Sequence, residues 1–269
     1  MTESPHKVRV VLVTGAARGI GAATVDALCA KGYCVMAVDS GDDMEPPPGV
    51  RYPLGRVEDL RALERRYPDQ VITELVDVRD AAALSHAAQT AVDRFGRLDA
   101  AVAAAAVIVG GSPLWETPED HLRTLLDVDV VGVWNTAAVT VPHMLAGQEP
   151  AGCRFVALAS AAGSDGLFHL AAYSAAKHAV VGLIRGLAED LVGTGVTAVA
   201  VSPGSTRTTM LQATADLYGV DDIEHFADSQ LLRRLLEPSE IAATVAFCCS
   251  LEGAVLNGSV VSATGGFSA

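Results

Sequence analysis

The chain has 269 residues and a formal net charge of −13 at pH 7; half of its residues are hydrophobic and 19% are charged. This composition excludes a disordered chain, and the acidic charge argues against binding to nucleic acid or an anionic membrane. The length suits one large domain or two small ones.

Targeting and redox signals are few. Residues 1–9 hold no apolar run of the signal-peptide type, and the most apolar run, residues 100–109, is too short to span a bilayer. The cysteines are odd in number, with no C-x-x-C pair and no metal-ligand spacing. We expect reduced, buried thiols in a cytoplasmic protein. The cysteines are Cys29, Cys34, Cys153, Cys248 and Cys249.

Apolar runs alternate with helix-like stretches along the chain. The predicted strands are residues 8–13, 33–38, 71–76, 98–107, 154–159, 196–201 and 260–263. The predicted helices are residues 22–30, 57–67, 81–95, 118–145, 171–191 and 240–249, the fourth disturbed near Pro142. Continuous apolar strands between helices predict an α/β fold: a doubly wound parallel sheet of Rossmann type, in a single domain over residues 1–269.

Two segments break this alternation. Residues 41–70, with three prolines at 46–48, read as an insertion after the second strand, and residues 57–67 within it as a short exposed helix. Residues 208–236 have weak periodicity and mixed polarity. We expect this second segment to be a mobile lid over a pocket.

Three glycines, Gly15, Gly19 and Gly21, follow the first strand and open a helix. Glycine lets the backbone approach a pyrophosphate, and the helix N-terminus supplies free N–H groups. Three ordinary turn glycines are the alternative, but the strand before and the helix after favour a dinucleotide site.

Asp39 ends the second strand, where a cofactor ribose would lie. Its carboxylate can accept a hydrogen bond from a 2′-hydroxyl and repels a 2′-phosphate, which favours NAD. Arg18 could pair with a 2′-phosphate and so favours NADP, whereas Ser40, which follows Asp39, adds no positive charge. A solvated strand-end carboxylate is the alternative for Asp39. Asp77 ends the third strand and can bind the adenine amine or act as a helix N-cap.

Tyr173 and Lys177 lie four residues apart, on one face of a predicted helix. The ammonium group favours the phenolate and lowers the tyrosine pKa, so that Tyr173 can take the proton of an alcohol. Lys177 can also hold the nicotinamide ribose, and Ser160, just past a strand end, can bind the substrate oxygen. A surface Tyr–Lys pair is the alternative, which the upstream glycines and Ser160 disfavour.

The stretch between Ser160 and Tyr173 should border the substrate. His169 within it is either a substrate contact or a surface-loop histidine. No histidine stands in the register of a serine hydrolase.

These motifs together resemble the short-chain dehydrogenase/reductase family over nearly the whole chain. The matching pieces are residues 14–21, Asp77-Val78, Ser160, residues 173–177, and Pro203-Gly204 followed by Thr208. The resemblance implies that Thr208 binds the nicotinamide carboxamide and that the assembly is a homotetramer. It also adds Ile20, Val78, Ala104, Pro203, Gly204 and Thr206 to the NAD site.

A subgroup resemblance is visible in residues 52–60, 77–80 and 113–116, which look like the mycofactocin-associated dehydrogenases of this family. Members of that subgroup are thought to keep NAD(H) bound and to pass electrons to a mycofactocin carrier. The resemblance implies the same carrier as a partner here.

Two positions depart from the family pattern. Ala104-Ala105-Ala106 replaces Asn-Ala-Gly, and Asp129 replaces the fourth catalytic residue, an asparagine that anchors a water in a proton relay. Aspartate can accept a hydrogen bond from such a water, and its charge can perturb Lys177. A tolerated substitution is the alternative, and we expect Asp129→Asn to retain or raise turnover.

The sequence therefore predicts an NAD(H)-dependent oxidoreductase that interconverts a secondary or primary alcohol and its carbonyl. The alternative is a non-catalytic NAD-binding regulatory or structural protein of the same fold. Mostly apolar pocket walls at residues 107–115, 163–170 and 208–236 favour a hydrophobic small-molecule substrate.

Overall fold

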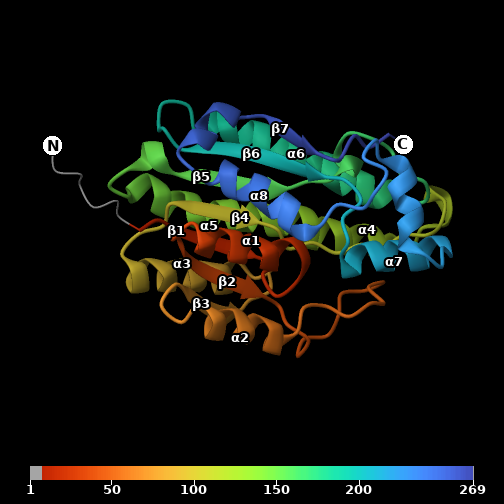
Figure 1. Ribbon diagram of the computed structural model, residues 1–269, viewed down its shortest axis with the longest axis horizontal. Coiled ribbons are helices and arrows are strands. Elements are labelled where there is room, and N and C mark those ends of the chain that lie inside the picture. Colours follow the sequence, from red (N-terminus) through yellow and green to blue (C-terminus); the bar gives the residue numbers. More distant parts are fainter. Residues whose placement is uncertain (1–7, 269) are drawn as a thin grey trace.

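A seven-stranded parallel sheet forms the centre of the computed structural model, which describes residues 8–268 (Figure 1). Residues 1–7, part of the stretch in which we expect no signal sequence, and residue 269 lie outside the described part. The strand order is β3-β2-β1-β4-β5-β6-β7. The strands are β1 (Val10–Thr14), β2 (Cys34–Asp39), β3 (Val71–Leu75), β4 (Ala100–Ala103), β5 (Arg154–Leu158), β6 (Thr197–Pro203) and β7 (Val260–Ala263).

Helices cover both faces of the sheet. One face carries α1 (Gly19–Ala30), α2 (Val57–Arg66) and α8 (Pro238–Cys248). The other carries α3 (Ala81–Phe95), α4 (Glu119–Leu125), α5 (Gly132–Ala146) and α6 (Ala171–Asp190). The predicted doubly wound, Rossmann-type fold is confirmed.

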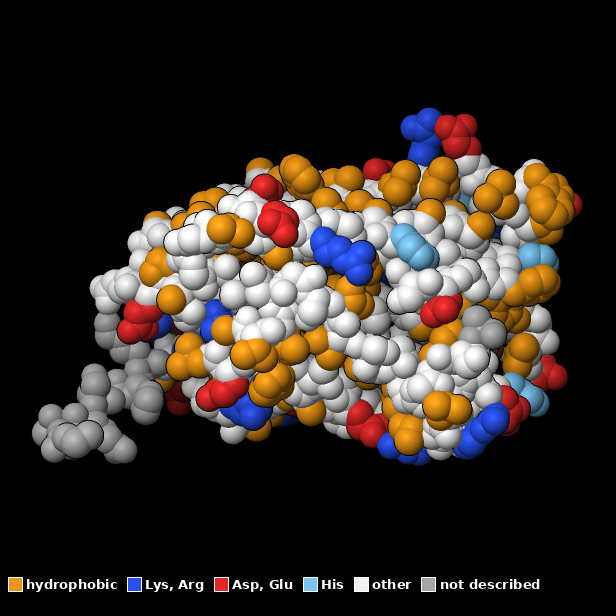
Figure 2. All heavy atoms as spheres, turned by 90° about the horizontal axis from the view of Figure 1, so that it is seen from above, with side chains coloured by type: hydrophobic (Ala, Val, Ile, Leu, Met, Phe, Trp, Pro, Cys, Tyr) orange, Lys and Arg blue, Asp and Glu red, His pale blue; other side chains and the backbone are white. Residues whose placement is uncertain are grey.

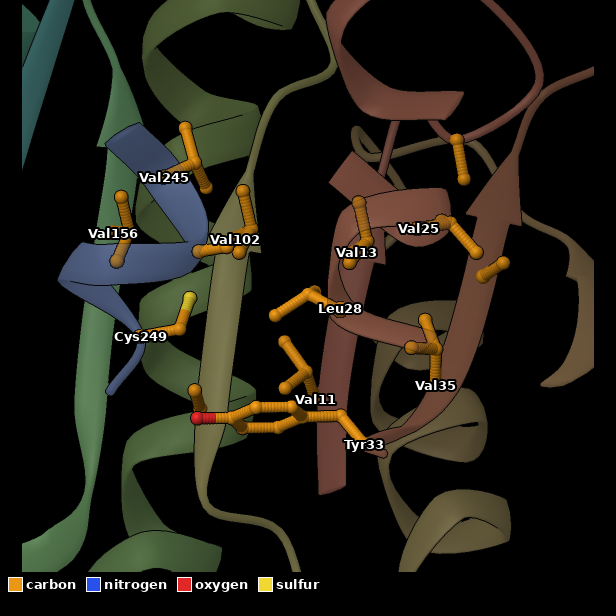
Figure 3. Packing of buried hydrophobic residues seen from close by; sticks show 14 of the residues in the cluster. Val11, Val13, Val25, Leu28, Tyr33, Val35, Val102, Val156, Val245 and Cys249 are labelled. Atoms are coloured by element: carbon orange, nitrogen blue, oxygen red, sulfur yellow. The ribbon is translucent and has the colours of Figure 1, made fainter. Parts of the chain in front are cut away.

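The burial of strand β1 shows why its first four residues, VVLV, are all apolar. Val11 and Val13 pack toward α1 and α8, whereas Val10 and Leu12 pack toward α3. Figure 3 shows the first of these layers, where Leu28 of α1 lies among strand valines. Alternate residues of a strand face opposite sides, so a doubly covered strand needs apolar residues throughout.

Strand order reverses between β1 and β4, which are neighbours in space although β2 and β3 separate them in sequence. In open parallel sheets a ligand crevice forms at the carboxyl ends of the strands at such a reversal. The fold therefore places a crevice beside Thr14 and Ala103.

The largest difference from the predicted elements lies in the helix expected at residues 118–145. It is interrupted not at Pro142 but at a π-helical segment, Leu126–Val131, between α4 and α5. Pro142 stays inside α5 on its exposed side, where water can satisfy the freed carbonyl. The stretch Glu119–Ala146 is long and apolar enough to cross a membrane by length and composition, but half of its most apolar window is buried in the fold.

Other boundaries differ less. The strand expected at residues 98–107 is shorter, because the chain leaves the sheet after Ala103. The segment 208–236 contains an ordered helix, α7 (Thr209–Tyr218). Short 3₁₀ helices complete the described elements: Leu114–Glu116, Pro150–Gly152, Ala161–Gly163, Ile223–Ser229 and Glu252–Leu256.

On the face in Figure 2, basic side chains stand in small groups among acidic and hydrophobic ones.

All five cysteines are free thiols.

Candidate active site

A cavity of about 550 Å³ opens at the carboxyl ends of the strands. It brings together every site residue predicted from the sequence except Asp129. The predicted residues that line it are Gly15, Arg18, Gly19, Ile20, Gly21, Asp39, Asp77, Val78, Ala104, Ser160, Tyr173, Lys177, Pro203, Gly204, Thr206 and Thr208.

The glycine loop is shaped by close backbone contacts. Gly15 has a φ of +66°, and a Cβ there would lie 2.7 Å from the Cα of Ala105. A Cβ on Gly21 would lie 1.9 Å from the carbonyl oxygen of Gly15. No side chain caps the N-terminus of α1, and its first turn holds no acidic residue. The first-turn N–H groups are thus left for a ligand, and this cradle fits the pyrophosphate of a dinucleotide.

Asp39 lies at the end of β2 beside this loop. Its Oδ2 accepts a hydrogen bond from Ala17 N at 3.0 Å, and its Oδ1 accepts one from Gly41 N at 3.2 Å. Arg18 does not pair with this carboxylate. The Arg18 guanidinium donates to the carbonyl of Pro53 and lies 5.3 Å from the ring centroid of Tyr52.

Asp77 lines the cavity but does not cap a helix. The N-cap of α3 is Asp80, whose Oδ1 accepts from Ala82 N and Ala83 N. The N-cap alternative for Asp77 is therefore wrong, because the chain makes one more turn before the helix begins. Burial raises the pKa of Asp77, but hydrogen bonds from Arg79 outweigh it, so the net pKa is lowered.

The Ala104–Ala106 departure is accommodated by the last residue of the neighbouring strand β1. The Thr14 hydroxyl accepts from both Ala104 N and Ala105 N, each at 3.1 Å. The loop after β4 is thus held against the glycine loop without the family's asparagine side chain.

Ser160, Tyr173 and Lys177 meet at the inner wall of the cavity. Ser160 follows β5, and its Oγ accepts from Ala162 N at 3.2 Å. Tyr173 and Lys177 lie on successive turns of α6, are 6% and 2% exposed, and place Lys177 Nζ 5.6 Å from the Tyr173 ring centroid. The surface-pair alternative is excluded by this burial.

The net pKa of Tyr173 is raised, contrary to the lowering expected from the sequence. Burial raises the pKa of Tyr173 most, Lys177 lowers it, Asp129 raises it, and a hydrogen bond with Ser160 lowers it. Burial disfavours the charged phenolate, and it outweighs the ammonium group here.

Asp129 stands behind the cavity wall, in the π-helical segment. Its Oδ2 lies 3.0 Å from Lys177 Nζ, and its Oδ1 accepts from Val107 N at 2.9 Å. Lys177 Nζ also approaches the carbonyl oxygen of Leu158, at 3.4 Å. Burial raises the pKa of Asp129, and Lys177 opposes that effect.

The segment after β6 forms another wall. Thr208 caps α7, because its Oγ1 accepts from Leu211 N at 3.2 Å. Thr206 Oγ1 donates to the carbonyl of Gly204 at 2.9 Å. These bonds fix the turn that carries Pro203 to Thr208 along the cavity.

The outer end of the cavity is aromatic. Phe168 and Tyr218 line it, and the Tyr218 hydroxyl donates to the carbonyl oxygen of Phe168 at 2.6 Å. His169 has a φ of +53°, stacks on Phe168 and is not among the lining residues, which favours the surface-loop alternative.

Two tyrosines were missed by the sequence analysis. Tyr218 joins α7 to the loop before α6. The Tyr52 hydroxyl accepts from Ile108 N at 2.9 Å and so joins the insertion to the cavity wall. The available signal was their rarity: the chain has five tyrosines, and Tyr52 and Tyr218 lie in the two segments that break the alternation of strands and helices.

Comparisons with a family model, with curated proteins and with solved structures all match this chain to oxidoreductases. A family model described as enoyl-(acyl carrier protein) reductase matches residues 15–268. The chain is 36% identical to (−)-trans-carveol dehydrogenase of Rhodococcus erythropolis, over 76% of this chain and 73% of that one. It is 31% identical to meso-2,3-butanediol dehydrogenase of Serratia marcescens, over 97% and 95% of the two chains. The crystal structure of carveol dehydrogenase from Mycobacterium avium in complex with NAD superposes with a TM-score of 0.88 at 30% identity, covering 96% of each chain.

Proposed function

The chain belongs to the short-chain dehydrogenase/reductase family, and from that premise we propose that it interconverts an apolar alcohol and its carbonyl compound with NAD(H). One observation carries the proposal. Ser160, Tyr173 and Lys177 line the same cavity as the glycine loop and Asp39. A proton-transfer group and a dinucleotide cradle therefore share one space, as hydride transfer requires.

The cofactor choice rests on the charges near the end of β2. Asp39 places a carboxylate where a 2′-phosphate would be repelled. Arg18 is turned toward Pro53 and Tyr52 of the insertion. These contacts favour NAD over NADP, and the NAD complex of the similar carveol dehydrogenase supports the same choice.

The chemistry at the inner wall follows from three side chains. A bound nicotinamide supplies or accepts the hydride and its two electrons. Ser160 Oγ orients the substrate oxygen, and Tyr173 Oη gives that oxygen a proton or takes one from it. Lys177 offers a positive charge to the phenolate and hydrogen-bond donors to the nicotinamide ribose. We propose that Thr208, which lines the same cavity, binds the carboxamide.

An apolar substrate is proposed from the lining of the outer end. The lining side chains there are Leu167, Phe168, Leu170, Met210, Leu211, Tyr218 and Phe226. A hydrophobic secondary alcohol buries against such a wall, whereas a charged substrate would find no ionic partner among these residues. The names of the relatives, carveol and butanediol dehydrogenases, support an alcohol substrate.

We also propose that NAD(H) stays bound and is reoxidised by a mycofactocin-type carrier. The insertion, residues 41–70, supplies Met44, Glu45, Pro47, Leu54 and Gly55 to the cavity lining. A strap over a cofactor slows its release, because the strap must move before the ligand can leave. We propose further that residues 208–236 form a lid over the substrate side of the cavity, and that the whole chain is one domain.

A cytoplasmic homotetramer is the proposed state. Exposed apolar side chains run along α4, the π-helical segment and α5, at Leu122, Leu126, Val131, Trp134 and Leu145; we call this set the stripe of α4 and α5. A stripe of this kind suits burial against a second copy of the chain.

The decisive experiment is Tyr173→Phe. We expect single-turnover hydride transfer to fall by at least about 100-fold, the lower bound for loss of a general acid–base group. NAD binding, measured by calorimetry, should be unchanged. Retention of full hydride transfer by this variant, with any alcohol of a panel, would refute the proposal. Mass spectrometry of the nucleotide extracted from the purified protein distinguishes NAD from NADP.

A further inference from the structure

Three ionisable side chains share the buried space around Tyr173 Oη. Lys177 and Asp129 form an ion pair with a distance of 3.0 Å, and their side chains are 2% and 0% exposed. Tyr173 itself is 6% exposed. Charges buried at this depth are poorly screened, so each affects the ionisation of the others.

The groups that face Tyr173 come from four parts of the fold. Lys177 lies on α6 itself, Asp129 on the π-helical segment, Ser160 at the end of β5, and Tyr52 on the insertion. Ser160 is uncharged, and burial raises the pKa of Tyr52 to about 12, so this phenol is neutral at neutral pH. Among the described residues, Lys177 and Asp129 are the charged groups that act on Tyr173.

The charge balance of this cluster depends on residue 129. With Lys177 and Asp129 paired, the cluster is neutral, and ionisation of Tyr173 would leave a buried net charge of about −1. With a neutral residue at position 129, the same ionisation would instead neutralise Lys177. A phenolate is therefore favoured without Asp129 and disfavoured with it.

Geometry fixes the pair in place. Asp129 Oδ1 is held by Val107 N at 2.9 Å, and Lys177 Nζ also approaches the carbonyl oxygen of Leu158 at 3.4 Å. The π-helical segment, the loop after β4 and the end of β5 are thus tied together at the lysine. The carboxylate partner of Lys177 therefore comes from the chain itself and is as buried as the lysine.

We propose that Asp129 is a positioning residue that holds the charge of Lys177 and so keeps Tyr173 protonated at neutral pH, preparing the site to donate a proton to a carbonyl oxygen. This inference rests on the proposed function. In that direction the substrate carbon receives the hydride and its electron pair from the reduced nicotinamide cofactor. The proton of Tyr173 Oη passes to the substrate oxygen, and the phenolate regains a proton from solvent. Asp129 leaves the alcohol–carbonyl equilibrium unchanged and alters only the pH at which each direction is fast.

The first test needs no turnover. Tyrosinate absorbance is titrated in the wild type and in Asp129→Asn, each compared with the same protein carrying Tyr173→Phe. We expect the Tyr173 phenolate to appear in Asp129→Asn at least about one pH unit lower than in the wild type. The control Asp127→Asn removes an exposed carboxylate from the same segment and should titrate like the wild type. Identical midpoints in the wild type and Asp129→Asn would overturn the proposal.

The second test is the pH profile of both reaction directions. In Asp129→Asn the oxidation profile should move toward acid by the same amount, so the expected retained or raised turnover applies to oxidation, whereas reduction at neutral pH should slow. If the wild type and Asp129→Asn have the same pH profiles while Tyr173→Phe is inactive, this inference is refuted and the proposed function stands. If Tyr173→Phe is active, the proposed function is refuted. If Asp129→Asn does not fold, the wild-type titration decides: a Tyr173 phenolate present at or below neutral pH contradicts the proposal.

Discussion

At the scale of single residues, burial changes what the sequence motif means. The spacing of Tyr173 and Lys177 correctly predicted a shared helix face and a common cavity. The spacing could not predict the direction of the Tyr173 pKa, because that depends on how far the phenol is removed from water. The spacing alone does not bring Asp129 to Lys177, since the contact joins helices distant in sequence; the family resemblance was the signal that the charge of Asp129 can act on Lys177.

Gly55 gives a residue-scale prediction for the cofactor site. A Cβ at this position would lie 2.8 Å from Asp39 Oδ1 and 2.7 Å from the Cβ of Ala17. Gly55→Ala should displace the Asp39 carboxylate at a cost of about 1–3 kcal/mol, which weakens NAD binding by about 5- to 150-fold. Calorimetric titration with NAD measures the effect.

A glycine in ordinary surroundings provides the control. A Cβ on Gly152 would meet its nearest neighbour at 3.4 Å, far from the cavity lining. Gly152→Ala should bind NAD as the wild type does. Equal affinity in the wild type and Gly55→Ala would show that Asp39 does not depend on this close contact.

At the scale of elements, the alternation of strands and helices was predictable because the central strands β1, β2, β4, β5 and β6 are buried on both faces, whereas the helices that flank them are buried on one. The π-helical segment was not predictable. Its sequence, Leu126–Val131, keeps an apolar pattern compatible with an ordinary helix, and the wider turn appears only in the backbone. The helix α7 was missed for a related reason: half of its residues line the cavity and others are exposed to solvent, so its side chains do not face one continuous core.

The hydrogen bond between α7 and the loop before α6 gives a prediction for the lid. Tyr218→Phe removes the 2.6 Å bond to the carbonyl of Phe168 while keeping the aromatic ring in the wall. The bond contributes about 0.5–1.5 kcal/mol to the closed arrangement, so KM should rise by about 2- to 10-fold with little change in kcat. Steady-state kinetics at saturating cofactor measures this.

Tyr67→Phe is the matched control, because Tyr67 lies next to α2, outside the cavity lining, and its hydroxyl interacts with Asp26. It should leave KM unchanged. A kcat loss in Tyr218→Phe at constant KM would show that Tyr218 acts on the chemical step and not on substrate retention.

At the scale of the whole molecule, the distribution of apolar side chains separates the cavity from the proposed subunit contact. The cavity lies at the carboxyl ends of the strands. The exposed stripe of α4 and α5 runs along the outer side of the helical layer that buries Asp129 and Lys177. The same helices therefore support the catalytic wall on one side and, as proposed, a second copy on the other.

Trp134 is the largest member of this stripe and is 61% exposed in the single chain. Burying an aromatic side chain of this size stabilises an interface strongly, and a buried unpaired carboxylate destabilises it. Trp134→Glu should therefore shift the protein from the tetramer to smaller species, as measured by sedimentation velocity. Because association with other copies stabilises the folded chain, we also expect the dissociated variant to lose thermal stability.

The chain's other tryptophan offers a matched control for this experiment. Trp115 is 81% exposed and lies on the short 3₁₀ helix Leu114–Glu116, off the stripe. Trp115→Glu introduces the same charge and removes the same ring, so it should sediment as the wild type does. If Trp134→Glu also keeps the wild-type sedimentation coefficient, the stripe on α4 and α5 is not the subunit contact. The helical layer that buries Asp129 and Lys177 would then be held in place by contacts within one chain and not by a second copy.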